Sequence, residues 1–167
     1  APASGFDVAG ETVLGVRTLD RFFPAGTTVV TAGAWSGGVL QTLGVSLPVK
    51  PIRGQIALLA TDPPLLRRVI MMGKEYLVPR TDGRVLVGST EEDVGFDCRP
   101  TPAGIRGLLD IAISIAPALG SAHLERTWAG LRPGSPDSKP FIGPVPGYRG
   151  IFVAAGHYRA GLQLSPV

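Results

Sequence analysis

The 167-residue sequence has too few sulfur and imidazole groups for several common kinds of site. It has one cysteine, Cys98, and two histidines, so it cannot form an internal disulfide and lacks the ligands for a closed zinc site. Its longest nearly apolar run, residues 111–119, is interrupted by Ser114 and Pro117 and is too short to cross a bilayer. The net charge of +3 is spread without blocks of one sign. We therefore expect no membrane and no nucleic acid as partners, and a cytoplasmic location by default.

The usual catalytic signatures are also missing. The sequence has no G-x-S-x-G nucleophile elbow, no G-x-x-x-x-G-K-[ST] phosphate loop and no H-E-x-x-H metal motif. It also has no G-x-G-x-x-G turn, the motif that holds the pyrophosphate of a dinucleotide. The sequence therefore gives no support to a hydrolase, a nucleotidase or a metalloenzyme.

Turn-forming residues, in contrast, are abundant. Glycine supplies 23 residues and proline 16, while 44% of all residues are hydrophobic. This composition allows a packed core but divides the chain into many short elements. It favours a strand-rich mixed fold over a helical bundle.

Apolar runs between the turns predict a series of strands. They are expected at residues 12–19, 27–32, 52–60, 65–72, 75–80, 84–90, 123–131 and 151–155. Asp82-Gly83, between two of them, is a strong hairpin signal. Residues 132–140 are expected to form a rigid loop. Because several strands follow one another closely, we expect an antiparallel or mixed sheet.

Two helical segments are expected. The longer runs from about Pro102 to Ala116, with Thr101 as its N-cap and a proline at its first position. Its apolar residues recur at helical spacing, so it should cover one face of the sheet. The shorter segment follows a glycine turn that begins at Gly33, and it ends at Gly44.

Five segments stand out together. They are Ala32–Gly37 (A-G-A-W-S-G), Pro51–Gln55 (P-I-R-G-Q), Tyr76–Arg80 (Y-L-V-P-R), Trp128–Pro133 (W-A-G-L-R-P) and Gly156–Gly161 (G-H-Y-R-A-G). Each motif alone is weak, but their order and approximate spacing resemble the D-amino-acid oxidase superfamily. The chain looks like the glycine oxidase branch of the thiamine-biosynthesis type, and the resemblance covers nearly all of it.

The resemblance implies residues that bind the substrate. Arg132 matches the arginine that grips the substrate carboxylate, and a guanidinium can make two parallel, charge-assisted bonds to that group. Tyr76 matches a tyrosine whose hydroxyl holds the same carboxylate. Arg159 is also expected to bind the substrate. The ordinary alternatives are a surface arginine in a loop and a strand tyrosine that packs its ring. The implied substrate is glycine, sarcosine or a small D-amino acid.

The resemblance also implies FAD as the cofactor. The residues expected to contact it are Gly33, Trp35, Arg53, Gly54, Gln55, Gly156, His157 and Gly161. Gly54 would let the backbone approach the flavin ring, although a strand bulge explains a glycine there equally well. Ala160 stands where the family usually has asparagine, so that side-chain contact is not carried over. No catalytic residue and no metal ligand is assigned.

The implied fold is α+β: a mixed, largely antiparallel sheet covered by one long helix, with remnants of the FAD domain at both ends. The boundaries expected are residues 1–45 and 148–167 for the remnants and 46–147 for the substrate-binding domain, together in one compact unit. Without a G-x-G-x-x-G segment, the chain alone is expected to bind FAD weakly and to be inactive.

Two functions from different classes remain open. In the first, the chain belongs to a working amine oxidase, in which hydride passes from the amine to flavin and then to dioxygen. It then needs a complementing FAD-domain chain or segment. In the second, it is a non-catalytic stand-alone domain or remnant that acts as an interaction module. Exposed apolar surface would then favour a homodimer.

Overall fold

The computed structural model describes residues 2–164, which form two compact units. The terminal unit is built from both ends of the chain, up to Ile52 and from Arg132 onward, and the middle unit is Arg53–Leu131. Compactness does not say what a unit binds. The division into FAD-domain remnants and a substrate-binding domain at residues 45 and 147 therefore stays a prediction.

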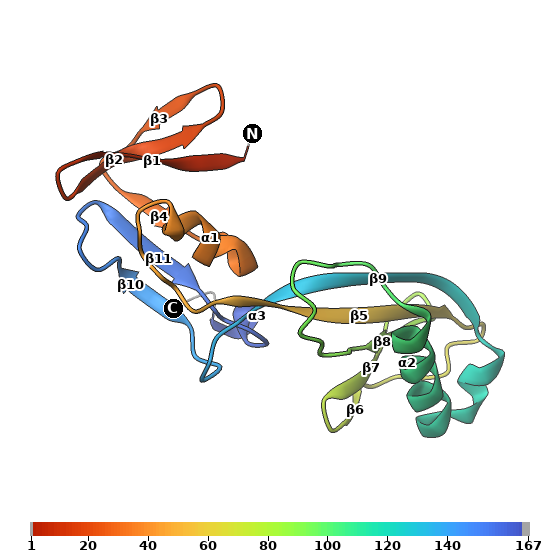
Figure 1. The fold of residues 1–167 in the computed structure, drawn as a ribbon. Helices are drawn as coiled ribbons and strands as arrows, with labels where there is room; N and C mark the ends of the chain where they lie inside the picture. Colours follow the sequence, from red (N-terminus) through yellow and green to blue (C-terminus); the bar gives the residue numbers. More distant parts are fainter. Residues whose placement is uncertain (1, 165–167) are drawn as a thin grey trace. The chain divides into compact units, whose positions relative to one another are not determined.

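Two three-stranded sheets make up most of the terminal unit (Figure 1). The first is antiparallel, with the order β1 (Ala3–Ala9), β2 (Thr12–Thr18) and β3 (Phe22–Pro24). The second has the order β10 (Phe141–Pro144), β11 (Ile151–Ala155) and β4 (Thr28–Val30), in which β11 is antiparallel to β10 and parallel to β4. Short helices follow two strands: η1 (Gly33–Trp35) and α1 (Ser36–Gln41) after β4, and α3 (Gly161–Leu164) after β11. Residues 165–167 lie outside the described part.

The core of the terminal unit lies on one face of the second sheet. Val30 of β4 and Ile151 of β11 pack there with Leu40 of α1, and none of the three is more than 5% exposed. Side chains alternate along a strand, so the neighbouring residues Val29 and Phe152 point to the opposite face. Both are exposed, at 56% and 41%. The second sheet is therefore apolar on both faces but buried on one.

A five-stranded sheet and the longest described helix form most of the middle unit (Figure 1). The strand order is β6 (Ile70–Met72), β7 (Glu75–Pro79), β8 (Arg84–Gly88), β5 (Lys50–Ala60) and β9 (His123–Gly134). The helices are α2 (Pro102–Ile115) and η2 (Pro117–Ser121). The pairs β6–β7, β7–β8 and β8–β5 are antiparallel. No helix within residues 2–164 is both long and apolar enough to pass through a membrane.

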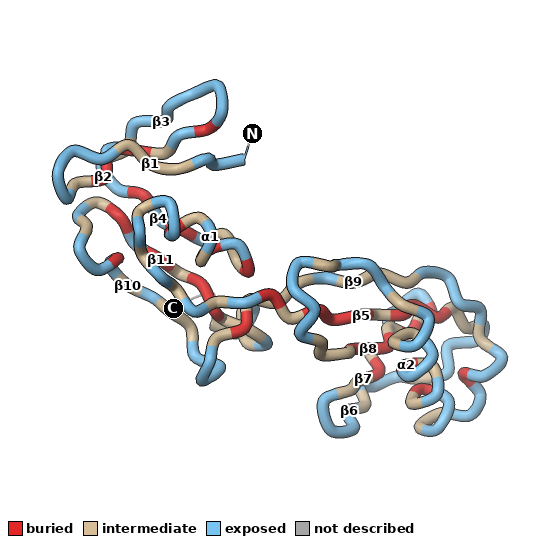
Figure 2. The backbone as a smooth tube through the Cα atoms, viewed as in Figure 1, coloured by how far each residue is buried: buried red, intermediate tan, exposed pale blue. Residues whose placement is uncertain are grey.

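Helix α2 packs on one face of this sheet. Leu77 of β7 and Val87 of β8 are buried in a cluster with Leu108 of α2, and Figure 2 shows buried residues gathered on β5, β7 and β8. By the alternation of side chains, Tyr76 and Gly88 belong to the face away from α2. Register supports this, because Tyr76 lies directly opposite Gly88.

The hairpin expected at Asp82-Gly83 is confirmed. Gly83 has φ of +83°, a left-handed conformation that glycine adopts without strain. The N–H of Arg80 donates to the carbonyl of Arg84 at 2.7 Å, which closes the turn between β7 and β8.

The structure corrects two expectations about strands and adds three strands. Within residues 65–72 only Ile70–Met72 is a strand, because the chain bends at Asp62-Pro63 and again at Arg67-Arg68. The loop expected at residues 132–140 begins as strand, since β9 continues to Gly134 beside a β5 that starts already at Lys50. Strands β1, β3 and β10 were not expected from the sequence.

Candidate functional site

Two parallel strands of the terminal unit end at the same edge of their sheet, here called the carboxyl edge. Val30 of β4 lies opposite Val153 of β11. The chain then passes through Gly33, with φ of +55°, after β4 and through Gly156, with φ of +78°, after β11. In open sheets with parallel strands, ligands bind beyond the carboxyl ends of the strands. The carboxyl edge is therefore the candidate cofactor-binding edge.

A cavity of about 380 Å³ lies at the carboxyl edge. Its lining includes Gly33, Pro133, His157 and Gly161. No atom of the described residues comes within 4 Å of the position that a Cβ on Gly33 would take, so the wall is open there. Trp35 is outside this lining and is 55% exposed. Three of the residues expected to contact the cofactor thus meet at one cavity of a size typical for ligand sites.

The segment that carries Arg132 is joined to the loop that carries Arg159. The N–H of Tyr158 donates to the carbonyl of Pro133 at 3.1 Å. Arg132 is half-buried and Arg159 is exposed. The structure therefore places the two expected substrate arginines on backbone segments of the terminal unit that are hydrogen-bonded to each other.

Tyr76 belongs to the middle unit and lies on the sheet face away from α2. Its ring covers Gly88: a Cβ on this glycine would lie 2.8 Å from three atoms of the tyrosine, including the hydroxyl oxygen. Aromatic side chains pack well over a glycine on the neighbouring strand, since no side chain competes for the space. The tyrosine is half-buried.

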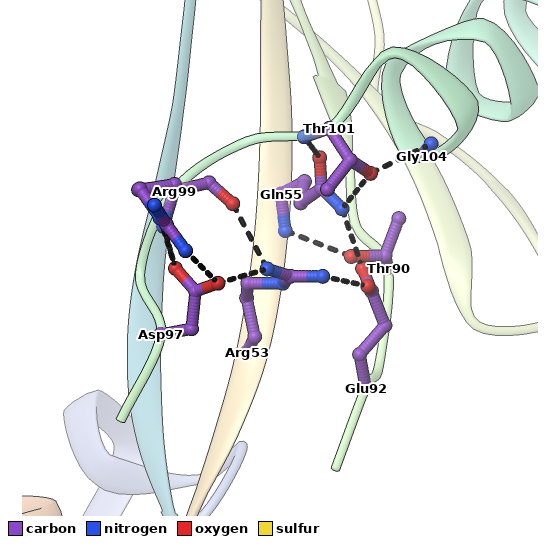
Figure 3. A network of polar contacts seen from close by, with 8 residues as sticks. All are labelled: Arg53, Gln55, Thr90, Glu92, Asp97, Arg99, Thr101 and Gly104. Atoms are coloured by element: carbon purple, nitrogen blue, oxygen red, sulfur yellow. Dashed lines mark hydrogen bonds and ion pairs between the residues drawn. The ribbon is translucent and has the colours of Figure 1, made fainter. Parts of the chain in front are cut away.

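Arg53 lies in a polar network of the middle unit (Figure 3). It is 4% exposed, and its guanidinium pairs with the Glu92 carboxylate. The same group donates to the carbonyl of Arg99 at 3.0 Å and lies 3.7 Å from the carboxylate of Asp97. A charge this deeply buried is stable only when it is paired and hydrogen-bonded. The side chain of Arg53 is therefore engaged inside its own unit.

Gln55 is fully buried and joins β5 to the start of α2 (Figure 3). Its Oε1 accepts from the N–H of Thr101 at 2.7 Å, and its Nε2 donates to Glu92 at 2.7 Å and to Thr101 Oγ1 at 3.1 Å. The Thr101 hydroxyl oxygen in turn accepts from the N–H of Gly104, so the expected N-cap is confirmed. A Cβ on Gly104 would lie 2.2 Å from Gln55 Nε2, which leaves room only for glycine.

The network lowers the pKa of its carboxyl groups. Burial raises the pKa of Glu92, but hydrogen bonds, led by those with Thr90 and Arg53, outweigh it and hold this pKa below its ordinary value. Hydrogen bonds from Arg99 hold the pKa of Asp97 far below its ordinary value. Both carboxylates are therefore ionised at neutral pH and compensate the charge of Arg53.

The sequence had not identified Glu92 and Asp97 as partners of Arg53, nor Thr101 as a partner of Gln55. The signal that could have indicated such partners was an arginine and a glutamine inside a buried strand, because buried polar side chains require polar partners. Those partners are remote along the chain: Glu92 is 39 residues from Arg53, and Thr101 is 46 residues from Gln55. The contact of Arg53, Gly54 and Gln55 with a cofactor stays a prediction. Among the described residues, no group of side chains could hold a metal ion.

Sequence comparison places the chain among known proteins. Residues 1–167 match the family DAO, described as FAD dependent oxidoreductase. Glycine oxidase of Pseudomonas putida is 44% identical over 163 residues, which are 98% of this chain and 45% of that protein. The bifunctional protein ThiO/ThiG of Synechocystis sp. is 41% identical over 160 residues, 93% of this chain and 24% of that protein. The chain thus spans less than half the length of these relatives.

Structure comparison agrees. The crystal structure of glycine oxidase from Geobacillus kaustophilus superimposes with a TM-score of 0.92 at 32% identity, over 99% of this chain and 45% of that one. The expected mixture of sheets with few helices is therefore the glycine oxidase fold. The chain belongs to the DAO family of FAD-dependent oxidoreductases and is related within it to the glycine oxidases.

Proposed function

We propose that the chain forms the substrate-binding part, and one edge of the flavin site, of an oxidase that acts on glycine or another small amino acid. The observation that carries this proposal is the cavity at the carboxyl edge. It is lined by Gly33, His157 and Gly161 and also by Pro133, the residue that follows Arg132. Elements expected at the cofactor thus meet the segment expected at the substrate. The relatives named glycine oxidase support an amino acid as the substrate.

The residues at the carboxyl edge fit part of a flavin cofactor. A volume of about 380 Å³ suits a ring-sized portion of FAD rather than the whole dinucleotide. Glycines there let a flat ring approach the backbone closely. The residues proposed to contact the cofactor are Gly33, Trp35, Gly156, His157 and Gly161. Bound FAD would supply the redox chemistry, taking a hydride from the α-carbon of the amine and passing the electrons to dioxygen.

The R-G-Q strand is proposed to contribute through its backbone. The side chains of Arg53 and Gln55 are engaged in the polar network of the middle unit. Gly54, between them, has no side chain to keep a ligand away from the strand.

The protein's own part in the reaction is to bind and orient the substrate. Arg132 is proposed to hold the substrate carboxylate with two parallel hydrogen bonds, and Arg159 adds positive charge from the neighbouring segment. In the middle unit, the hydroxyl of Tyr76 is proposed as a donor to a substrate carboxylate. Holding one end of a small substrate in this way fixes where its α-carbon lies, which is the main contribution a binding site makes to such a reaction.

The open face of the second sheet supports a proposal about the partner. Val29, Ile142 and Phe152 are 56%, 54% and 41% exposed. Sheets with parallel strands are normally covered on both faces, and an exposed apolar patch marks an interaction site. Because relatives are more than twice as long, we propose that an FAD-domain polypeptide covers this face, and that a second copy of the chain covers it when no such partner is present.

The test is the visible absorbance spectrum of the purified chain, taken before and after incubation with excess FAD and gel filtration. Flavin absorbance that stays with the protein supports a flavin site on this chain. A colourless protein, both alone and after mixing with an FAD-domain chain, would refute the proposal.

The substrate assignment is tested by Arg132→Ala in the FAD-loaded protein complemented with an FAD-domain chain, since the chain alone is expected to be inactive. Loss of two charge-assisted hydrogen bonds should raise KM for glycine by about 100-fold. Arg132→Lys keeps the charge but cannot make two parallel hydrogen bonds, so its KM should lie between those of the unchanged protein and Arg132→Ala. An unchanged KM in both variants would exclude Arg132 as the carboxylate ligand.

A further inference from the structure

Tyr76 and Gly88 face each other across the β7–β8 hairpin. A Cβ on Gly88 would lie 2.8 Å from Cε2, Cζ and the hydroxyl oxygen of Tyr76, closer than real Cβ atoms come to any neighbour. The three atoms are the tip of the ring, which carries the hydroxyl. Any side chain at position 88 would therefore displace that tip.

A left-handed backbone conformation does not explain this glycine. Gly88 is not among the glycines with positive φ, whereas Gly83 in the turn of the same hairpin has φ of +83°. Alanine could thus adopt the conformation of Gly88 without the strain that a left-handed residue brings. The contact that a side chain at position 88 would make is with the ring of Tyr76.

Few described neighbours restrain the Tyr76 ring on the face of the five-stranded sheet that points away from α2. The residue opposite Tyr76 on its other side is Met71 of the edge strand β6, which is 67% exposed. Among the described residues, the Tyr76 hydroxyl has no hydrogen-bond partner, so packing sets where it lies. Ile56 of β5, beyond Gly88, is the next neighbour on that face.

We infer that Gly88 is a positioning residue for the substrate site: it fixes the place of the Tyr76 hydroxyl and thereby its hydrogen bond to the substrate carboxylate. The inference rests on the proposed function for the role of Tyr76 and on the described geometry for the role of Gly88. It extends the proposed site to a residue that acts through the side chain of Tyr76.

Fluorine NMR of the chain labelled with fluorotyrosine tests the geometry by itself. The chain has 3 tyrosines, and Tyr76→Phe identifies the resonance of Tyr76. Gly88→Ala should shift that resonance and leave those of Tyr148 and Tyr158 unchanged. Gly130→Ala is the matched control, because this glycine lies in the same sheet and its Cβ would meet nothing within 4 Å. An unmoved Tyr76 resonance in folded Gly88→Ala protein overturns the inference.

A double-mutant cycle covers the case that Gly88→Ala folds poorly. The substitution should lower the urea midpoint of the unchanged protein but have a much smaller effect in a Tyr76→Ala background, where no ring occupies the space. Equal losses in both backgrounds would show that Gly88 is needed for another reason and would overturn the inference.

Glycine titration of the chain mixed with an FAD-domain polypeptide and FAD tests the consequence for binding. Gly88→Ala should weaken glycine binding by about ten-fold, and should weaken it no further in a Tyr76→Phe background, which has no hydroxyl to position. If the unchanged protein binds glycine and Gly88→Ala binds it equally well, the positioning role is wrong. If the unchanged protein does not bind glycine, the proposed function fails, while a shifted Tyr76 resonance still supports the geometric part.

Discussion

At the scale of single residues, the Glu92 carboxylate compensates the buried charge of Arg53 and so stabilises the folded state. Glu92→Gln keeps the size of the side chain but removes its charge, so it leaves a buried guanidinium undercompensated. We expect a loss of about 2 kcal/mol in the free energy of unfolding, less than for a fully buried pair because the Glu92 side chain is 27% exposed. Urea denaturation at neutral pH measures it. Asp110→Asn, which breaks an exposed pair with Arg106 on α2, is the control and should change little.

The same carboxylate should make stability depend on pH. Because the folded state holds the pKa of Glu92 below its ordinary value of 4.5, the stabilisation is complete above that value and is lost as pH falls toward the lowered pKa. Between about pH 5 and pH 3, the urea midpoint of the unchanged protein should therefore fall more steeply than that of Glu92→Gln. Parallel curves would show that Glu92 does not titrate as a paired carboxylate.

The two key pairs of the middle unit differ in how far the sequence could predict them. The Asp-Gly turn predicts that Tyr76 and Gly88 lie on neighbouring strands of one hairpin, but a two-residue turn would place Ser89 opposite Tyr76, whereas the observed register places Gly88 there. Arg53 and Glu92 are 39 residues apart, and irregular backbone precedes Glu92, so no periodicity joins them. Local rules could predict the hairpin of the first pair to within one residue of its register, while only the folded chain shows the second pair.

At the scale of elements, helix α2 offers a matched pair of glycines. Gly107→Ala should raise the free energy of unfolding by about 0.5–1 kcal/mol, because alanine is the better helix former and its Cβ meets nothing within 4 Å. Gly104→Ala gains the same propensity but places its Cβ 2.2 Å from the buried Gln55 amide. We expect a net loss of about 2 kcal/mol or more. Thermal unfolding of the two variants measures both, and equal shifts would contradict the packing at Gln55.

The elements that the sequence predicted well are those with a strong local signal. Thr101 and Pro102 marked the start of α2, and the Asp-Gly turn marked the β7–β8 hairpin. Strands β1, β3 and β10 lacked such a signal: β3 has three residues, all exposed, and β10 contains Gly143 and Pro144. Their strand conformation comes from pairing with β2 and β11, which is tertiary context that overrides weak propensity.

At the scale of the whole molecule, the family could be predicted because five short motifs occur in one order along the chain. Their arrangement in space could be predicted only in part. Gly33, His157 and Gly161 line one cavity, whereas Arg53 and Gln55 serve the interior of the middle unit. A motif that packs inside a unit and a motif that contacts a ligand can look alike in a sequence, since both use the same residue types.

The open face of the β10-β11-β4 sheet leads to the last prediction, which concerns association. Phe152 and Val29 are paired on neighbouring strands and exposed, although the opposite face of the same strands is buried. Without an FAD-domain partner, the chain should bury this apolar face against a second copy of itself. Light scattering should then show a dimer, and Phe152→Lys should give a monomer because a lysine charge cannot be buried unpaired. Leu124→Lys, at an exposed apolar position of β9 in the middle unit, is the control and should leave the dimer intact. A monomer in the unchanged protein, or a dimer that Phe152→Lys does not disrupt, would place the association surface elsewhere.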